Sequence, residues 1–277
     1  MSEQDPRTLI ADVFGQVADV YDQQGVDFFS QFGRRLVALA GLKPGWRVLD
    51  VGTGRGAVLF PAADAVLPGG GEVLGVDLSQ AMVDATAADV QRRGLQNVYL
   101  QALDAQVLPG LPERAYDAVL GGLVAFFLPD PHAAVRRWFE LLRPGGRLAL
   151  SSFAGEDFRF KPAHEAIAMF LPDRTPIRPP SNDAFQNGDT IADLLRSAGF
   201  VEVGSVERVH DTVFESPEQW WEWQNSHGGR INTARIPEHL REDAKAAACA
   251  ALEPLRRDDG TLLLQPKLRY TVADRPR

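Results

Sequence analysis

Short runs of apolar and β-branched residues alternate with stretches of helical periodicity between Arg47 and Phe153. These runs predict five strands, at residues 47–51, 72–77, 98–102, 116–120 and 147–153. The intervening segments predict helices near 57–66, 79–93 and 131–142, with Ser79 as an N-cap and Gly94 as a C-terminal stop. This alternation is typical of a parallel sheet covered by helices on both faces, so the pattern predicts an α/β fold.

The sequence on either side of this block is more helical. Two helices are expected before it, at 6–21 and 26–40. After it we expect a helix at 162–171, a helix capped by Thr190, a strand at 200–209, helices opened by the capping box 216–219 and by Pro237, and a strand at 268–272. The five strands of the central block and the strands at 200–209 and 268–272 together make seven.

A glycine-rich motif, Asp50-Val51-Gly52-Thr53-Gly54-Arg55-Gly56, joins the first strand to a helix. Glycines let the backbone approach a ligand closely at the carboxyl end of the sheet. The motif also fits the dinucleotide fingerprint, and such turns occur for packing reasons alone. Asp77 ends the second strand, where a carboxylate accepts both hydroxyl protons of a ribose, so the cofactor is expected to contain adenosine.

Two further carboxylates bear on which adenosine cofactor binds. Asp50 ends the first strand, where it suits a ligand carrying an ammonium and a sulfonium but would repel a pyrophosphate. Asp104 follows the third strand and is placed to accept the exocyclic amine of an adenine. These residues argue against an NAD(P)-dependent oxidoreductase, which remains an alternative for the glycine motif.

Taken in order, these features resemble the class I S-adenosylmethionine-dependent methyltransferases, especially the ubiquinone/menaquinone-biosynthesis type and its small-molecule relatives. The resemblance covers residues 14–153 well and 190–209 more loosely. It rests on Phe14, Ala18, Tyr21 and Asp22 in the spacing of the family's N-terminal segment, on the motif 50–56, and on Asp77, Asp104, Ala105 and Gly121.

The resemblance implies a Rossmann-like sheet of seven strands, mostly parallel, with one antiparallel strand from the last hairpin. It also implies that Tyr21 closes over the methionine end of S-adenosylmethionine, that Leu78 and Met82 sandwich the adenine, and that S-adenosylhomocysteine is the product. We expect one domain over 1–277, with a helical N-terminal cover (1–42), a cofactor-binding core (43–156), helical lid insertions over the substrate (157–188 and 215–266), and the C-terminal part of the sheet (189–214 and 267–277).

The candidate substrate and catalytic residues lie outside the cofactor motifs. Relatives often carry a histidine near the end of strand four, where this chain has Phe126 and Phe127, so an apolar substrate pocket is expected. Trp220, Trp223 and His227 share one helix face, which forms an aromatic wall beside an imidazole unless the tryptophans are simply core. His227 is the preferred general base, ahead of Glu165, His164 and His210.

The charge and hydropathy of the chain exclude two classes of binding partner. A net charge of −8 repels phosphate backbones, and no apolar stretch approaches the ~18 residues of a membrane span, so neither nucleic acid nor membrane is expected. The polar, acidic first twelve residues lack a signal-peptide core, which indicates a cytoplasmic protein. No metal-ligand spacing is evident, and a homodimer is left open.

The preferred function is methyl transfer to a small, largely apolar or aromatic metabolite, in specialised-metabolite or quinone-like biosynthesis. The lid insertions suggest this substrate because they contain three tryptophans and four phenylalanines, Phe158, Phe160, Phe170 and Phe185. An oxygen, carbon or nitrogen acceptor is left open. A protein of the same fold that binds S-adenosylmethionine without methylating is the second alternative.

Overall fold

Seven strands form the main sheet of the computed structural model, which describes residues 6–177, 182–185 and 187–277. The seven-stranded prediction is therefore confirmed. The strands are β1 (Arg47–Val51), β2 (Glu72–Asp77), β3 (Val98–Ala102), β4 (Tyr116–Gly122), β5 (Leu142–Gly155), β6 (Val201–Val209) and β9 (Lys267–Asp274).

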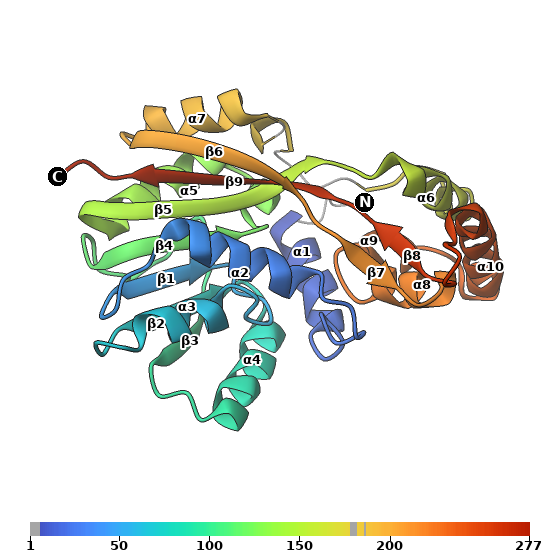
Figure 1. Ribbon diagram of the computed structural model, residues 1–277, viewed down its shortest axis with the longest axis horizontal. Coiled ribbons are helices and arrows are strands. Elements are labelled where there is room, and N and C mark those ends of the chain that lie inside the picture. The colour runs from blue at the N-terminus through green and yellow to red at the C-terminus, as the bar shows by residue number, and fades with distance from the viewer. Residues whose placement is uncertain (1–5, 178–181, 186) are drawn as a thin grey trace.

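The strand order is β3-β2-β1-β4-β5-β9-β6 (Figure 1). The strands from β3 to β5 pair in parallel, and β9 runs antiparallel to both β5 and β6. The chain order reverses between β1 and β4, and ligands of open α/β sheets bind at the carboxyl ends of strands next to such a reversal. The glycine motif follows β1 and therefore lies at this point.

Successive side chains of a strand point to opposite faces of the sheet, and in these strands both sets are largely apolar. Helices therefore cover both faces. Val48 of β1 belongs to a core with Leu36 and Leu59, whereas its neighbour Leu49 belongs to a second core with Trp138. The helices of this body are α1 (Pro6–Val17), α2 (Phe29–Ala40), α3 (Leu59–Val66), α4 (Gln80–Arg93), α5 (Pro131–Leu141) and α7 (Gly188–Ser197).

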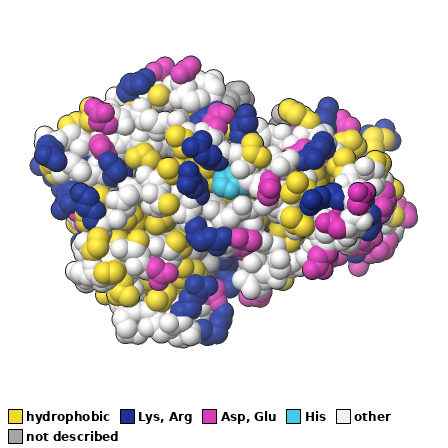
Figure 2. Space-filling model, in the orientation of Figure 1, with side chains coloured by type: hydrophobic (Ala, Val, Ile, Leu, Met, Phe, Trp, Pro, Cys, Tyr) yellow, Lys and Arg dark blue, Asp and Glu magenta, His cyan; other side chains and the backbone are white. Residues whose placement is uncertain are grey.

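A separate helical lobe extends from the carboxyl-end side of the sheet, at the right of Figure 1. It contains α6 (Lys161–Ala168), α8 (Pro217–Asn225), α9 (Arg230–Thr233), α10 (Arg241–Leu252) and the antiparallel pair β7 (Thr212–Phe214) and β8 (Leu262–Leu264). Helix α10 packs on α6 and α8, so segments from the two expected lid insertions join in one lobe. Figure 2 shows acidic side chains gathered on its outer surface.

Short 3-10 turns connect several of these elements, at Ala125–Phe127, Phe158–Phe160, Asn182–Phe185, Glu238–Leu240 and Glu253–Leu255. Within the described ranges, no helix is long and apolar enough to cross a membrane.

Most predicted strand bounds agree with the structure, whereas several predicted helix bounds do not: α1 ends at Val17 rather than at 21, and α2 begins at Phe29 rather than at 26. The α7 helix is capped by Asn187, whose Oδ1 accepts the Thr190 N–H at 2.9 Å, so the prediction of Thr190 as the cap was wrong. Strand β5 begins at Leu142, five residues before the predicted start at 147, and Leu142 pairs with Tyr116 across a register shift. The β7–β8 pair was not predicted.

Candidate active site at the carboxyl end of the sheet

Three glycines in the left-handed region shape the turn after β1, with φ of 66° at Gly52, 49° at Gly54 and 82° at Gly56. A Cβ on Gly52 would lie 2.3 Å from Val124 Cγ2. No described atom lies within 4 Å of the Cβ position at Gly54. Packing therefore requires glycine at position 52, whereas Gly54 leaves the backbone open where a cofactor is expected.

Asp50 is a buried carboxyl beside this turn, with 1% of its surface exposed. Thr53 Oγ1 donates a hydrogen bond to Asp50 Oδ2 at 2.7 Å, and Oδ1 is buried without a partner among the described residues. Burial raises the pKa of Asp50 to about 7, and the nearby Asp77 adds to the increase. A cationic group placed against Oδ1 would stabilise the ionised form.

Asp77 connects the second strand to the glycine turn. Its Oδ2 accepts the Gly54 N–H at 2.8 Å and its Oδ1 accepts the Ser79 N–H at 2.9 Å. Burial raises its pKa despite these bonds. Each carboxylate oxygen has a second lone pair, so Asp77 can still accept ribose hydroxyls. The adjacent Leu78 is 39% exposed at the same sheet edge, a position open to an apolar ligand surface.

Asp104 and Ala105 begin the loop after β3. Asp104 Oδ1 accepts the Gln106 N–H at 2.8 Å, which holds the carboxyl in an Asx-type turn. The buried Trp138 of α5 donates its indole N–H to the Ala105 carbonyl at 2.8 Å. Helix α5 therefore holds the loop that carries both predicted adenine-contact residues.

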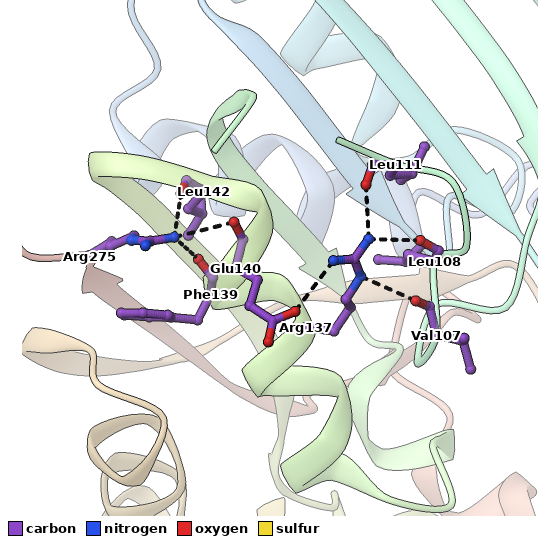
Figure 3. A network of polar contacts seen from close by, with 8 residues as sticks. All are labelled: Val107, Leu108, Leu111, Arg137, Phe139, Glu140, Leu142 and Arg275. Atoms are coloured by element: carbon purple, nitrogen blue, oxygen red, sulfur yellow. Dashed lines mark hydrogen bonds and ion pairs between the residues drawn. The ribbon is translucent and has the colours of Figure 1, made fainter. Parts of the chain in front are cut away.

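Arg137, beside Trp138 on the same helix, holds the rest of this loop (Figure 3). Its guanidinium donates to the carbonyls of Val107, Leu108 and Leu111 at 3.2, 3.1 and 2.9 Å. Arg275 donates to the carbonyls of Phe139, Glu140 and Leu142 and thereby closes the C-terminal end of α5. The sequence analysis overlooked both arginines, because their partners are backbone carbonyls of segments far from them in the chain.

Tyr21 follows α1 in the N-terminal cover. Burial raises the pKa of Tyr21, and the charges of Asp22 and Asp77 raise it further. The ring stacks on Phe29 at 4.7 Å between centroids and lies 6.0 Å from Phe14. The N-terminal cover thus brings an aromatic cluster to the cofactor turn.

Arg55 of the glycine motif links the turn to this cover. It donates to the carbonyl of Ala18 and pairs with Asp89 of α4 at 2.6 Å, and its side chain is only 8% exposed. Met82, a predicted adenine contact, is 1% exposed and packs with Val17 and Ala18 beneath the cover. Met82 therefore packs against the N-terminal cover. Its predicted contact with the adenine stays a prediction.

The end of β4 supplies the other predicted apolar residues. A Cβ on Gly121 would lie 2.8 Å from Leu150 Cδ2, so packing within the sheet accounts for this glycine. Phe126 and Phe127 form a ring pair at 4.6 Å, and Phe127 meets Phe14 of the cover edge-to-face at 5.4 Å. The two predicted substrate residues of the β4 loop are therefore in contact with the N-terminal cover.

The tryptophans of α8 belong to the large hydrophobic core, with Trp220 0% and Trp223 5% exposed. Trp223 nevertheless reaches the cover, with ring centroids 4.7 Å from Phe28 and 4.2 Å from His227. Both indole N–H groups are buried without an acceptor among the described residues. The tryptophans are thus core residues, and Trp223 is the one that touches the cover.

His227 lies at the junction of lobe and cover, where its ring contacts Phe29 at 5.6 Å. Its Nδ1 accepts the Gly229 N–H at 3.1 Å, so the neutral ring carries its proton on Nε2. Nε2 is buried without a partner among the described residues. Burial, together with nearby His164, lowers the pKa of His227 to about 3. This geometry equips His227 to donate a hydrogen bond and makes it a weak base.

The other base candidates have partners elsewhere. Glu165 is exposed and pairs with Lys161 at 3.3 Å along α6. His164 contacts the Nε2 atom of Gln224 through its own Nε2 at 2.5 Å. His210 contacts the Tyr270 hydroxyl through Nε2 at 2.8 Å, in a separate part of the cover–sheet junction.

Several contacts between the cover and the lobe were not predicted from the sequence. Phe28 and Phe29 of the cover meet Trp223 and His227 of the lobe, and Gln224 bridges towards His164. The adjacent Phe28 and Phe29 before a helix could have indicated an aromatic contact surface in the cover. Their partners could not be identified from the sequence, because they lie about 195 residues away in the chain. Among the described residues, no group of three or more His, Cys, Asp or Glu could hold a metal ion.

The arrangement fits the expected cofactor in three independent respects. A buried carboxyl oxygen of Asp50 lacks a partner among the described residues, Gly54 leaves open backbone beside it, and Asp77 faces the same turn. These groups suit a cation, a close ligand approach and a ribose, respectively.

Comparisons with known proteins agree with this chemistry. Residues 48–146 match the family model described as a methyltransferase domain. The chain is 37% identical to nocamycin O-methyltransferase of Saccharothrix syringae over 87% of this chain and 88% of that protein. It is 38% identical to aklanonic acid methyltransferase DauC of Streptomyces sp. (strain C5), over 63% of this chain and 82% of that protein.

The fold also matches solved structures. The cyclase SpnF superposes with a TM-score of 0.55 at 22% identity, covering 89% of this chain and 81% of that one. The family match excludes the oxidoreductase alternative for the glycine motif. From its glycine turn, its strand-end carboxylates and its relatives, the chain belongs to the class I S-adenosylmethionine-dependent methyltransferases.

Proposed function

We propose that this methyltransferase methylates an oxygen atom of a small, largely aromatic metabolite in specialised biosynthesis, and that the oxygen is acidic enough to ionise unaided. One observation carries the choice of acceptor. The lobe side of the site presents His227 Nε2–H and Trp223 Nε1–H, two buried donors without acceptors among the described residues. Such donors are satisfied by a carbonyl, phenolate or carboxylate oxygen.

The relatives support the same choice. One is named an O-methyltransferase and the other is named for its action on aklanonic acid, an acidic substrate by its name. The aromatic side chains Phe14, Phe127, Phe29 and Trp223 bring apolar surface to the junction of cover, sheet and lobe. An aromatic metabolite would pack against these rings and be oriented by the lobe donors.

We assign separate roles in cofactor binding and in methyl transfer to the residues of the site. With the cofactor bound, Asp50 would face its positive group through the unpartnered Oδ1, Asp77 would hold the ribose, and the loop 104–111 would border the adenine. S-adenosylmethionine supplies an electrophilic methyl group on its sulfonium when it is bound. The cover and lobe exclude water and align the acceptor oxygen, so transfer depends on positioning.

No general base is required in this proposal. The pKa of His227 is lowered to about 3, so its conjugate acid is far too strong for the ring to take a proton from a phenol at neutral pH. Its proposed role is therefore to donate Nε2–H to the substrate, which lowers the pKa of the substrate's own acidic group. We accordingly replace the base hypothesis for His227 with a donor role.

The experiment uses S-adenosylmethionine carrying a ¹³C-methyl group and a panel of hydroxyanthraquinones, phenols and aromatic carboxylic acids. We expect S-adenosylhomocysteine to form together with a product whose ¹³C shift is that of an O-methyl group. A C-methyl or N-methyl shift would overturn the choice of acceptor. Conversion of a substrate without S-adenosylhomocysteine would instead support the non-methylating alternative, which the fold shared with a cyclase keeps open.

A further inference from the structure

A polar cavity opens on the helical lobe between α8, α9 and α10. Its volume is about 210 Å³, well above the ~10–15 Å³ that a single water needs on the same measure. Residues from all three helices line it, including Glu222, Asn225, Arg230, Thr233, Arg241 and Lys245. None of these residues belongs to the methyl-transfer site described above.

The cavity lies on the face of α8 opposite the tryptophans that approach the cover. Trp221, Glu222 and Asn225 line the cavity, whereas Trp220, Trp223 and Gln224 occupy the other side of the helix. Residues three and four positions apart on a helix share a face, so the two sets lie on opposite sides of α8. The cavity is therefore separate from the methyl-transfer site but shares a helix with it.

Its lining carries more positive than negative charge. Arg230, Arg241 and Lys245 contribute three cations against Glu222 and Glu242. Lys245 pairs with Glu222 at 2.8 Å, which leaves two arginines facing one further carboxylate. This contrasts with the outer surface of the lobe, where acidic side chains gather (Figure 2).

Two donors within the lining point to a ligand. Thr233 is 4% exposed, and its Oγ1 is buried without a partner among the described residues. The Nε of Arg230 is likewise buried and unpartnered in the described part of the chain. Buried donors of this kind are normally paired, and an arginine with a neighbouring hydroxyl is suited to an oxyanion.

We propose that this cavity is a binding site for a small oxyanion, a phosphoryl or carboxylate group held by Arg230 and Thr233 with Arg241 at its rim. Its occupant joins α8, α9 and α10, and so braces the lobe whose other face carries Trp223. The proposal is independent of the proposed methyl acceptor, because it concerns the opposite face of α8.

The test is calorimetric titration of the full chain with inorganic phosphate and, separately, with succinate, in the absence of S-adenosylmethionine. We expect saturable binding of at least one of them. Arg230→Gln should weaken it about 10- to 100-fold and Thr233→Val roughly 2- to 10-fold, as loss of a charge-assisted and of a neutral hydrogen bond predicts. Tighter binding of phosphate identifies a phosphoryl group, and tighter binding of succinate a carboxylate.

Arg257→Gln is the matched control, since Arg257 is an exposed arginine of the same region outside the cavity lining. It should leave binding unchanged. Thr233→Val preserves side-chain volume and carries the test if Arg230→Gln does not fold. Absence of saturable binding of both anions to the wild type, or an equal loss in Arg257→Gln, would overturn the proposal.

Discussion

Replacing Asp50 with asparagine is expected to stabilise the ligand-free fold at neutral pH while weakening cofactor binding. The reason is that Asp50 is fully buried and its pKa is raised to about 7. An asparagine has nearly the same shape and can still accept the hydrogen bond from Thr53 Oγ1, but it cannot ionise. The substitution therefore removes the charge and leaves the packing.

The magnitude for stability comes from the pKa of Asp50, about 7 in the fold against an ordinary value of 3.8. At 1.36 kcal/mol for each pKa unit, ionisation costs the native state roughly 4 kcal/mol. Because the folded pKa is raised, this penalty develops as pH rises from about 4 to about 7 and is complete above that range. The buried amide of asparagine offsets about 1–3 kcal/mol of the gain.

Urea unfolding at pH 5 and pH 8 measures the first effect. The stability difference between Asp50→Asn and wild type should increase with pH and reach on the order of 1–3 kcal/mol at the higher value. A destabilisation of equal size at both pH values would refute the raised pKa of Asp50.

Calorimetry with S-adenosylmethionine measures the second effect. Loss of a charge-assisted contact should weaken binding about 10- to 100-fold at pH 8. Wild-type affinity should rise with pH up to about 7 and then level off, because the bound cation favours the ionised carboxyl, whereas the variant should show no such rise. Equal affinities for wild type and variant would remove Asp50 from the cofactor site.

Three further substitutions test other parts of the site. Asp77→Asn should weaken S-adenosylmethionine about 10-fold or more in the same calorimetric assay, and unchanged affinity would exclude a ribose contact. Arg137→Met removes three hydrogen bonds to loop carbonyls. It should lower the free energy of unfolding, measured by urea denaturation, by about 1–3 kcal/mol and should weaken cofactor binding. Arg137→Lys should restore only part of each loss. His227→Phe should lower kcat about 10-fold and shift the rising limb of the pH profile to higher pH, because the substrate loses the donor that lowers its pKa, while cofactor affinity stays unchanged. A loss of 10²-fold or more in which that pH limb disappears altogether would restore the base role.

The N-terminal half of the sheet could be predicted residue by residue from the sequence. Strands β1, β2 and β3 have the predicted bounds, and α4 has its predicted Ser79 cap and Gly94 stop. These features are local: apolar runs set the strands, and a side-chain cap or a left-handed glycine ends the helix. The candidate cofactor carboxylates could also be chosen from the sequence, because each lies at or just after the carboxyl end of a strand in a parallel sheet.

Prediction of the helix cap from local sequence failed where two nearby residues were equally suitable. Asn187 and Thr190 are both good N-cap residues three positions apart, and the structure selects Asn187, whose side chain accepts the Thr190 N–H. The same applies to His227, since periodicity placed it beside Trp223 but could not show which ring nitrogen carries the proton. The Gly229 N–H determines that through its bond to Nδ1.

The sequence by itself determined most strands of the main sheet and the glycine turn, because these depend on residues close together in the chain, and it favoured a cofactor that contains adenosine. Tertiary structure alone decided which aromatic rings meet, with Phe29 of the cover against His227 of the lobe, and which helix holds the loop after β3, through Arg137. Both depend on contacts between distant segments, which form only when apolar burial brings the cover, the sheet and the lobe together.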